Sequence, residues 1–199
     1  MSLSKGEFAI RPSLDISMLK VSFTDPYASL RLSTRLGEYL RQLRGGRRIA
    51  VVCLGTDRST GDALGPLAGT TLLKYHSSLF DLYGTLEEPV HALNLDATLN
   101  KLHDAAANPF IIGIDACLGK VSSVGCVLLG EGPILPGAGV NKKLPPVGDI
   151  HMSGVVNVGG FLDHYVLQST RLHVVMSMSE LIARSLYHAI AVSVKEASE

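Results

Sequence analysis

Apolar positions along the chain form short continuous runs in some places and recur every three or four residues in others. The runs at 49–54 and 110–114 are short and end in turn residues, which is typical of buried strands. Between 32 and 43, leucine and tyrosine recur at helical spacing after an Asp-Pro pair that suits a helix start. Helices are expected after Asp25 and at about 66–76, 95–107 and 177–194, with strands at 49–54, 89–93, 110–115, 123–129 and 172–176.

Strands that alternate with helices in this way predict an α/β fold, with a mostly parallel sheet and helices on both faces. The 199 residues suffice for one domain with a full core. Residues 1–23 show no clear period and are expected to be an amino-terminal arm or pro-segment, ahead of a single domain over 24–199. Residues 130–160 are rich in glycine and proline and are expected to be irregular and functional.

Composition limits the classes of partner. Lysine and arginine number 18, as do aspartate and glutamate, so no overall field attracts nucleic acid or an anionic membrane. Three cysteines without a CxxC spacing favour a reducing compartment. The amino terminus lacks the apolar core of a signal peptide, and no run reaches the ~20 apolar residues of a membrane span. We therefore expect a cytoplasmic protein without nucleic-acid or membrane partners.

The loop at 55–66 reads Gly-Thr-Asp-Arg-Ser-Thr-Gly-Asp-Ala-Leu-Gly-Pro and follows the first predicted strand directly. It places Asp57 and Asp62 after the carboxyl end of that strand, and Asp115 ends the strand at 110–115. Ligand and catalytic sites of open parallel sheets gather outside the carboxyl ends of the strands. The three carboxylates are therefore expected to share one crevice.

Asp62 and Asp115, taken as a pair, predict acid–base chemistry. Two carboxylates ~4 Å apart repel by about 4 kcal/mol at an effective dielectric constant near 20. That energy corresponds to roughly 3 pKa units, enough for one carboxyl to keep its proton near neutrality while the other is ionised. Such a pair can activate water against an amide. The same carboxylates could instead hold a divalent cation, with His151 from the irregular region as a third ligand.

Structural roles compete with these assignments. Asp62 could cap the helix that follows, Asp57 could close its own turn, and Asp115 could bond loop amides. Cys117 is expected to be a packed thiol, and the loop lacks the Gly-Lys-Ser/Thr ending of a phosphate loop. The other histidines are expected to be ordinary surface or interior residues, namely His76, His91, His103, His164, His173 and His188.

Three segments resemble the spore germination protease in the same order and at comparable spacing. They are the strand and loop at 54–66, the Ile-Asp-Ala at 114–116, and the Pro-Gly-Ala-Gly-Val-Asn-Lys-Lys at 136–143. The form Gly-Thr-Asp-Arg-Ser-Thr-Gly-Asp-x-Leu-Gly-Pro most closely resembles the YyaC family of sporulation proteins from spore-forming Firmicutes. By this resemblance, which covers about residues 48–195, the chain is identified as a member of that family.

The resemblance implies an atypical aspartic endopeptidase that acts on small acid-soluble spore proteins, with Asp62 and Asp115 as its catalytic pair. It also implies the three-layer α/β/α sandwich of the hydrogenase maturation proteases, in which two acids and a histidine engage nickel. The chain departs from the protease pattern at Thr56-Asp57 and Thr60-Gly61, where the protease has Gly-Asn and Thr-Pro, and it is much shorter. Asp57 thereby adds a third carboxylate, which is expected to modulate the pair.

We therefore expect a sporulation-associated peptidase, placed in the forespore by the resemblance, that needs no cofactor and acts on a protein or peptide such as a spore protein. A non-catalytic binding or regulatory protein is one alternative. A factor that holds nickel or zinc through Asp62, Asp115 and His151 is another, and homo-oligomer formation stays open. The substrate cleft is expected to be formed by Gly55, Thr56, Gly61, Gly137, Gly139 and Asn141.

Overall fold

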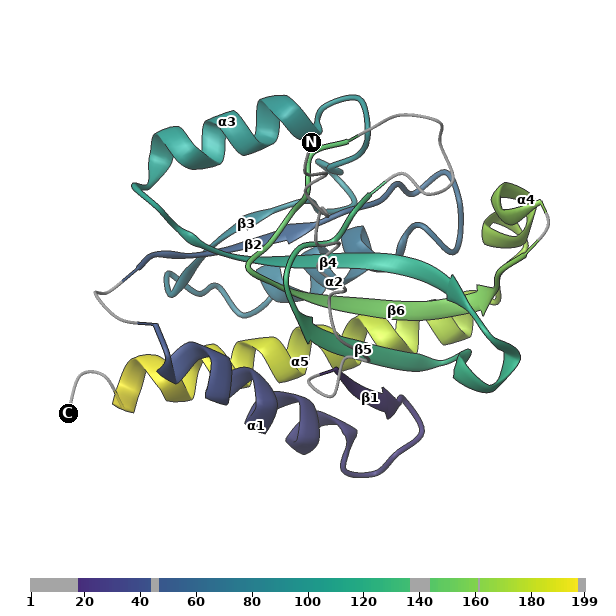
Figure 1. Cartoon of the computed structure of the whole chain (residues 1–199), viewed down its shortest axis with the longest axis horizontal. Coiled ribbons are helices and arrows are strands. Elements are labelled where there is room, and N and C mark those ends of the chain that lie inside the picture. Colours follow the sequence, from purple (N-terminus) through teal and green to yellow (C-terminus); the bar gives the residue numbers. More distant parts are fainter. Residues whose placement is uncertain (1–17, 44–46, 137–143, 161, 197–199) are drawn as a thin grey trace, which may run out of the picture.

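In the part of the chain that the structure describes, the sheet has six strands, of which four adjacent ones pair in parallel. The computed structural model describes residues 18–43, 47–136, 144–160 and 162–196. The strands are β1 (Leu19–Ser22), β2 (Ile49–Cys53), β3 (Phe80–Tyr83), β4 (Phe110–Gly119), β5 (Cys126–Glu131) and β6 (Ile150–Val158). Their order is β1-β5-β6-β4-β2-β3 (Figure 1). β6, β4, β2 and β3 are parallel, whereas β5 runs antiparallel to both β6 and β1.

Helices cover both faces of this sheet. The helices are α1 (Ala28–Arg41), α2 (Leu64–Leu73), α3 (Leu95–Ala105), α4 (Asp163–Gln168) and α5 (Leu172–Glu196), with a 3-10 turn η1 at Val121–Ser123. α1, α2 and α5 pack in the core on one face, and α3 packs in a second core on the other. Figure 1 shows α3 above the sheet and α1 and α5 below it. The predicted three-layer α/β/α sandwich is confirmed.

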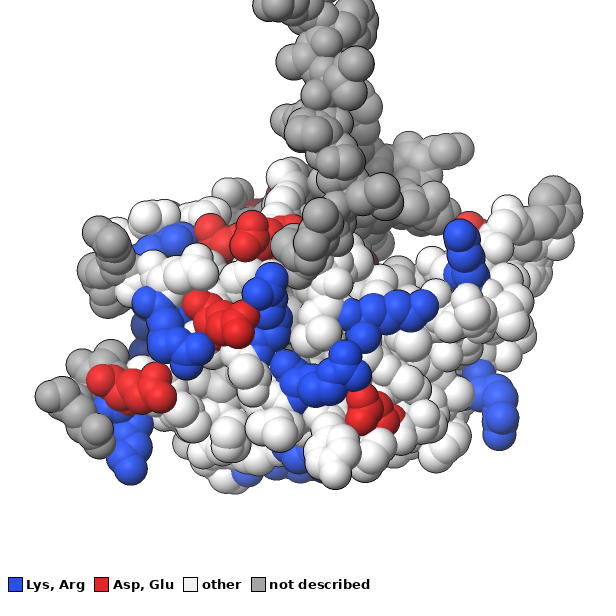
Figure 2. Space-filling view, turned by 60° about the horizontal axis from the view of Figure 1, so that its bottom comes forward, with Lys and Arg blue, Asp and Glu red and all other residues white. Residues whose placement is uncertain are grey.

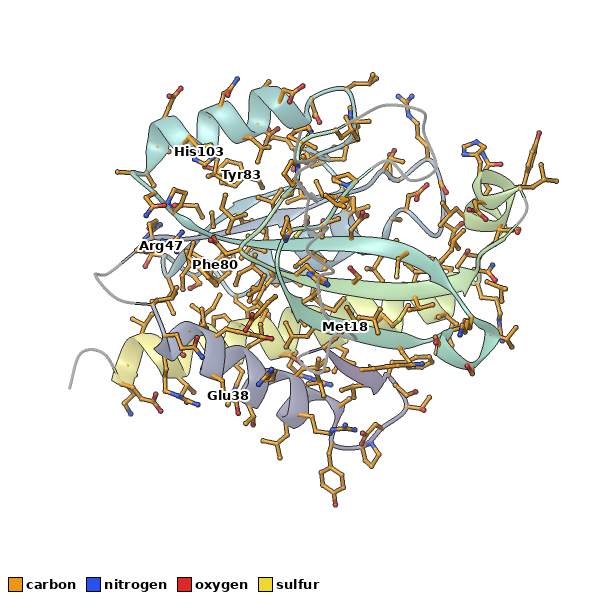
Figure 3. The ribbon with its side chains drawn as sticks, viewed as in Figure 1. Met18, Glu38, Arg47, Phe80, Tyr83 and His103 are labelled. Carbon is orange, nitrogen blue, oxygen red and sulfur yellow. The ribbon has the colours of Figure 1, made fainter. Side chains whose placement is uncertain are left out.

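The central strands read as apolar runs because both of their faces are buried. All five residues of β2 are buried; Val51 and Cys53 face α1 and α5, while Ala50 and Val52 face α3. The same division continues at the edge strand, where Figure 3 shows Phe80 and Tyr83 on opposite sides of the sheet. This continuous burial explains why the sequence predicts β2 and most of β4 correctly.

The expected arm over 1–23 is wrong at its carboxyl end. Leu19–Ser22 forms β1 and pairs with β5, and the Val21 side chain is 1% exposed. The folded domain therefore includes residues before 24. Four residues are too few for a visible period, and only the pairing with β5 makes this segment a strand.

Other elements differ from expectation for reasons of packing. The expected strand at 172–176 is the first turn of α5, because Val175 continues the buried stripe of Met178 and Ile182 at helical spacing. The region 130–160 contains the central strand β6, whose apolar run is interrupted by Gly154, where the Leu64 side chain leaves no room for a Cβ. Neither β3 nor α4 is predicted, and in place of a strand at 89–93 there is an isolated bridge between Val90 and Leu54.

The surface shows no segregation of charge on the face drawn in Figure 2, where basic and acidic side chains are interspersed. Two ion pairs on the α1 side, Arg31 with Asp25 and Arg35 with Glu38, have N–O distances of 2.7 Å. Within the described ranges, no helix combines the length and the apolar character needed to cross a membrane.

Candidate functional site

The loop after β2 folds back over the carboxyl end of its strand. Leu54 donates its N–H to the Ile114 carbonyl of β4 at 2.7 Å, and Gly55 donates to Val90 at 2.8 Å. Gly55 has φ of 139°, and a Cβ there would lie 1.9 Å from the Asp62 carbonyl oxygen. Thr56 in turn donates its N–H to that oxygen at 3.2 Å. Glycine at 55 therefore lets the loop close and bring Asp62 above the end of β2.

Asp115 lies inside its strand and not at the strand end as expected. β4 runs on to Gly119 because β6 continues beside it, with Asp115 paired to Ser153. On its other side, the pairing with β2 stops at Ile114. The Asp115 side chain, on the α3 side of the sheet, therefore emerges just past the end of β2. Its Oδ1 accepts the Ala116 N–H at 2.8 Å.

Asp62 and Asp115 line one pocket of about 510 Å³ at the carboxyl ends of the parallel strands. Residues 53 positions apart in the sequence are thus brought together, as the strand-end argument predicts. Thr56 and Ser153 also line the pocket, and much of the remaining wall is apolar. The apolar side chains are Leu54, Ala92, Leu95, Ala116, Leu118, Ile134, Leu135, Pro136, Leu144 and Leu167.

The two carboxyl groups differ in their surroundings. Burial raises the pKa of Asp115 to about 7, with the Ala116 N–H acting in the opposite direction and the charge of Asp62 raising it further. Burial also raises the pKa of Asp62, but the nearby Ser59 hydroxyl and the charge of His164 act to lower it. The Ser59 hydroxyl is buried and has no hydrogen-bond partner among the described residues, so it acts on Asp62 as a close polar neighbour.

The structural alternatives for the loop acids have separate outcomes. The residue that precedes α2 is Ala63, and this helix start has no side-chain cap, so Asp62 does not serve as the expected alternative cap. Asp57 is exposed and does not line the pocket. Any influence of Asp57 on the pair would act from outside the pocket.

His151 does not lie where the metal hypothesis needs it. It pairs with Gly113, two residues before Asp115 on the neighbouring strand, which is about 6–7 Å along the sheet. Its Nδ1 donates to the Gly132 carbonyl at 3.0 Å. The predicted set of Asp62, Asp115 and His151 therefore does not form. Across the described part of the chain, no group of three or more His, Cys, Asp or Glu side chains is placed to hold a metal ion.

Two histidines that the sequence assigns to ordinary positions line the pocket instead, His91 and His164. His164 follows the carboxyl end of β6, just as Asp62 follows the carboxyl end of β2. The same strand-end argument would have found it had β6 been predicted. His91 precedes α3, on a segment that pairs with the end of β2.

The short helix α4 forms one wall of the pocket. Gly61 donates its N–H to the Leu167 carbonyl at 2.9 Å, which joins α4 to the Asp62 loop. Asn157 of β6 donates from Nδ2 to the Val166 carbonyl at 3.2 Å and holds α4 on the sheet. α4 therefore fixes the position of the loop that carries Asp62.

Two of the six residues expected to form the cleft line the pocket. Gly55 and Thr56 line the pocket, whereas Gly61 supports it from behind through Leu167. Gly137, Gly139 and Asn141 lie outside the described residues. Cys117 lines the pocket with its thiol, and burial together with the charge of Asp115 raises the pKa of that thiol to about 11. A protonated thiol is a poor nucleophile, which agrees with its expected non-catalytic role.

These observations define a mixed α/β protein with a pair of carboxyl groups in a pocket at the ends of its parallel strands. The chain belongs to the family described as "Protein of unknown function (DUF1256)", whose model matches residues 20–185. It is 51% identical over 166 residues to the "Uncharacterized protein YyaC" of Bacillus subtilis (strain 168), which covers 83% of this chain and 80% of that protein. The predicted relation to YyaC is confirmed. A similar solved structure is that of a NiFe hydrogenase maturation protease, HycI, from Thermococcus kodakarensis KOD1, with a TM-score of 0.47, 17% identity, and coverage of 75% of this chain and 99% of that one.

Proposed function

We propose that this protein is a peptidase in which Asp62 and Asp115 activate a water molecule against a peptide bond. One observation carries the proposal: both carboxyl groups line a single pocket, and the pKa of Asp115 is raised to about 7. A carboxyl with that pKa can keep its proton near neutrality and act as an acid. A carboxyl with a lower pKa beside it can act as a base.

The environments of the two groups suggest their roles. His164 and Ser59 favour the ionised form of Asp62, so Asp62 is the base that takes a proton from the attacking water. Asp115 is more strongly shifted, so it donates its proton to the carbonyl oxygen of the scissile bond. The hydroxyl adds to the carbonyl carbon. As the C–N bond breaks, the proton held by Asp62 passes to the leaving nitrogen, and Asp115 recovers its proton from the collapsing hydroxyl.

The sequence resemblance to the germination protease supports the biological part of the proposal. We infer a sporulation-associated enzyme of the cytoplasm, in the forespore, that acts on spore proteins or peptides from them. The proposed chemistry uses two carboxyl groups and needs no cofactor. The largely apolar walls of the pocket suit a substrate segment with apolar side chains next to the scissile bond.

The test compares the wild type with Asp62→Asn and Asp115→Asn on a denatured spore-extract proteome, with products identified by mass spectrometry. Each variant should lower cleavage at least 100-fold, because each removes one half of the proton transfer. Asp57→Asn, an exposed acid of the same loop, is the matched control and should keep most of the activity. Equal product patterns from the wild type and both pocket variants would overturn the proposal.

A non-catalytic binding or regulatory role is the second candidate, and the large apolar share of the pocket wall favours it. A binding pocket of this kind needs no proton transfer. In that case Asp62→Asn would retain the same peptides from the extract as the wild type, and neither protein would cleave them.

A further inference from the structure

The turn that carries His91 is held rigidly at the edge of the pocket. The Asn94 side chain accepts the His91 N–H at 2.8 Å and donates to the Pro89 carbonyl at 2.9 Å. The His91 carbonyl accepts the Leu95 N–H at 3.0 Å, at the start of α3. These bonds close the chain around His91 and fix its backbone.

The same turn also orients the imidazole ring. Nδ1 of His91 accepts the backbone N–H of Leu93 at 3.3 Å. A ring nitrogen that accepts carries no proton, so the proton of the neutral ring is on Nε2. Among the described residues no hydrogen-bond partner is found for Nε2, and the His91 side chain lines the pocket. The turn therefore offers one N–H donor that none of the described residues uses.

His91 lies across the pocket from Asp115. Val90 accepts the Gly55 N–H and bridges to Leu54, and Leu54 donates to Ile114 on its other side. The segments that carry His91 and Asp115 are thus separated by the end of β2, which corresponds to two strand spacings or about 10 Å. About three residues of an extended peptide span that distance.

We propose that His91 is a substrate-binding residue that donates from Nε2 to a backbone carbonyl oxygen of the bound peptide, about three residues from the scissile bond. This rests on the proposed peptidase function. An extended peptide presents a carbonyl at every residue, whatever its side chains, so a single fixed donor positions any sequence. The bond would hold the substrate in register with the two acids.

Two substitutions separate the binding role from the structural role of the ring. In His91→Asn, the amide oxygen replaces Nδ1 as the acceptor for Leu93 N–H, as in an Asx turn, but the distal donor is lost. In His91→Gln, the amide N–H₂ can reach the place of Nε2, but the acceptor for Leu93 is lost. Asn therefore preserves the turn and removes the donor, while Gln does the reverse.

The experiment uses an equimolar library of random tetradecapeptides, with cleavage followed by mass spectrometry. KM and kcat are then measured on the best-cleaved peptide, beside thermal unfolding of each variant. His91→Asn should raise KM about 3- to 10-fold with little change in kcat, the effect of losing one hydrogen bond made equally in the ground and transition states. His91→Gln should stay within about 2-fold of the wild-type KM while unfolding at a lower temperature.

The opposite order, with His91→Gln the poorer enzyme and His91→Asn unchanged, would show a structural role and overturn the proposal while the peptidase function stands. Asp62→Asn is tested on the same library. If it cleaves the same peptides as the wild type, or if neither protein cleaves any, the peptidase function fails, and the role of His91 fails with it. The comparison of the wild type with Asp62→Asn therefore distinguishes the two failures.

Discussion

Asp115 is a carboxyl group that the fold places where ionisation is costly. Its strand continues beside β6, but its neighbour β2 has ended, so the side chain is half-buried at the bottom of the pocket. Among the described residues one backbone N–H, that of Ala116, donates to it, and the charge of Asp62 opposes its ionisation. The neutral form of Asp115 is therefore favoured up to about pH 7.

The stability of the fold should depend on pH through this group. The pKa of Asp115 is raised from an ordinary value of 3.8 to about 7, so its contribution to stability is fully present below pH 3.8 and lost as the pH rises through 7. Asp115→Asn should therefore be more stable than the wild type at pH 8, by at most ~4 kcal/mol, and nearly equal to it at pH 4. Urea unfolding at pH 4, 6 and 8 measures this difference. An equal difference at all three values, or one matched by Asp57→Asn, would contradict it.

The pH dependence of cleavage should follow from the same raised pKa. If protonated Asp115 is the acid, kcat/KM should fall on the basic side near pH 7, about tenfold per unit. On the acidic side it should fall when Asp62 becomes protonated. Initial rates between pH 4 and 9 check both limbs, with Asp57→Asn expected to keep the wild-type profile. A rate that is constant from pH 6 to 8.5 would exclude Asp115 as the proton donor.

At the scale of elements, α4 and the Asp62 loop act as one unit. The Gly61 N–H bonds the Leu167 carbonyl, and α4 is held on β6 through Asn157. A Cβ at Gly61 would lie 2.8 Å from Leu167 Cδ2 and 3.0 Å from the Leu167 carbonyl oxygen. The absence of a side chain at 61 thus allows the two segments to touch.

Gly61→Ala should push α4 away from the loop. We expect a loss of 1–3 kcal/mol in the free energy of unfolding, as for other overpacked sites, and a larger proportional loss of cleavage, because the loop carries Asp62. Gly37→Ala is the matched control. Its new Cβ would lie 3.5 Å from Arg41 Nη1, an ordinary contact inside α1, so it should stabilise the protein by up to about 1 kcal/mol. Chemical denaturation measures the free energy of unfolding of both variants, which should fall for Gly61→Ala and rise for Gly37→Ala. An unchanged value for Gly61→Ala would show that α4 adapts without cost.

At the scale of the whole molecule, the sheet extends to β1, beyond the strands that form the pocket. β1 pairs with β5 and places Val21 in the core shared by α1 and α5. The pocket lies at the carboxyl ends of the parallel strands, where Leu95 of α3 and Leu167 of α4 help to line it. The two-sided core supports the pocket without filling it.

Val21→Ala should show where the folded domain begins. Because Val21 is 1% exposed, its truncation should lower the free energy of unfolding by about 2 kcal/mol. Lys20→Ala, on the exposed side of the same strand, should change it by less than about 0.5 kcal/mol. Thermal or urea unfolding distinguishes them. Equal effects from the two substitutions would mean that residues 19–22 belong to an arm.

Local patterns predict an element well where burial is continuous along it. The apolar run of β2 predicts a strand because both of its faces are buried. The helical periods of α1 and α3 predict helices because each packs an apolar stripe against the sheet. β6 was not predicted, because it alternates polar residues and glycine with apolar ones and gains its place from neighbours on both sides. The start of α5 is wrongly predicted as a strand because its short run of apolar and β-branched residues fits a strand as well as a helix, and only the packing distinguishes the two.

Local apolar runs are enough to predict the class of fold and two acids of the pocket, because such runs locate the strand ends and the residues that follow them. Only the tertiary structure decided which histidines accompany those acids. His91 and His164 reach the pocket through a bridge to β2 and through a short helix held on β6, whereas His151 is carried below it by its register with Gly113. Register and long-range hydrogen bonds join residues far apart in the chain, and no local pattern records them.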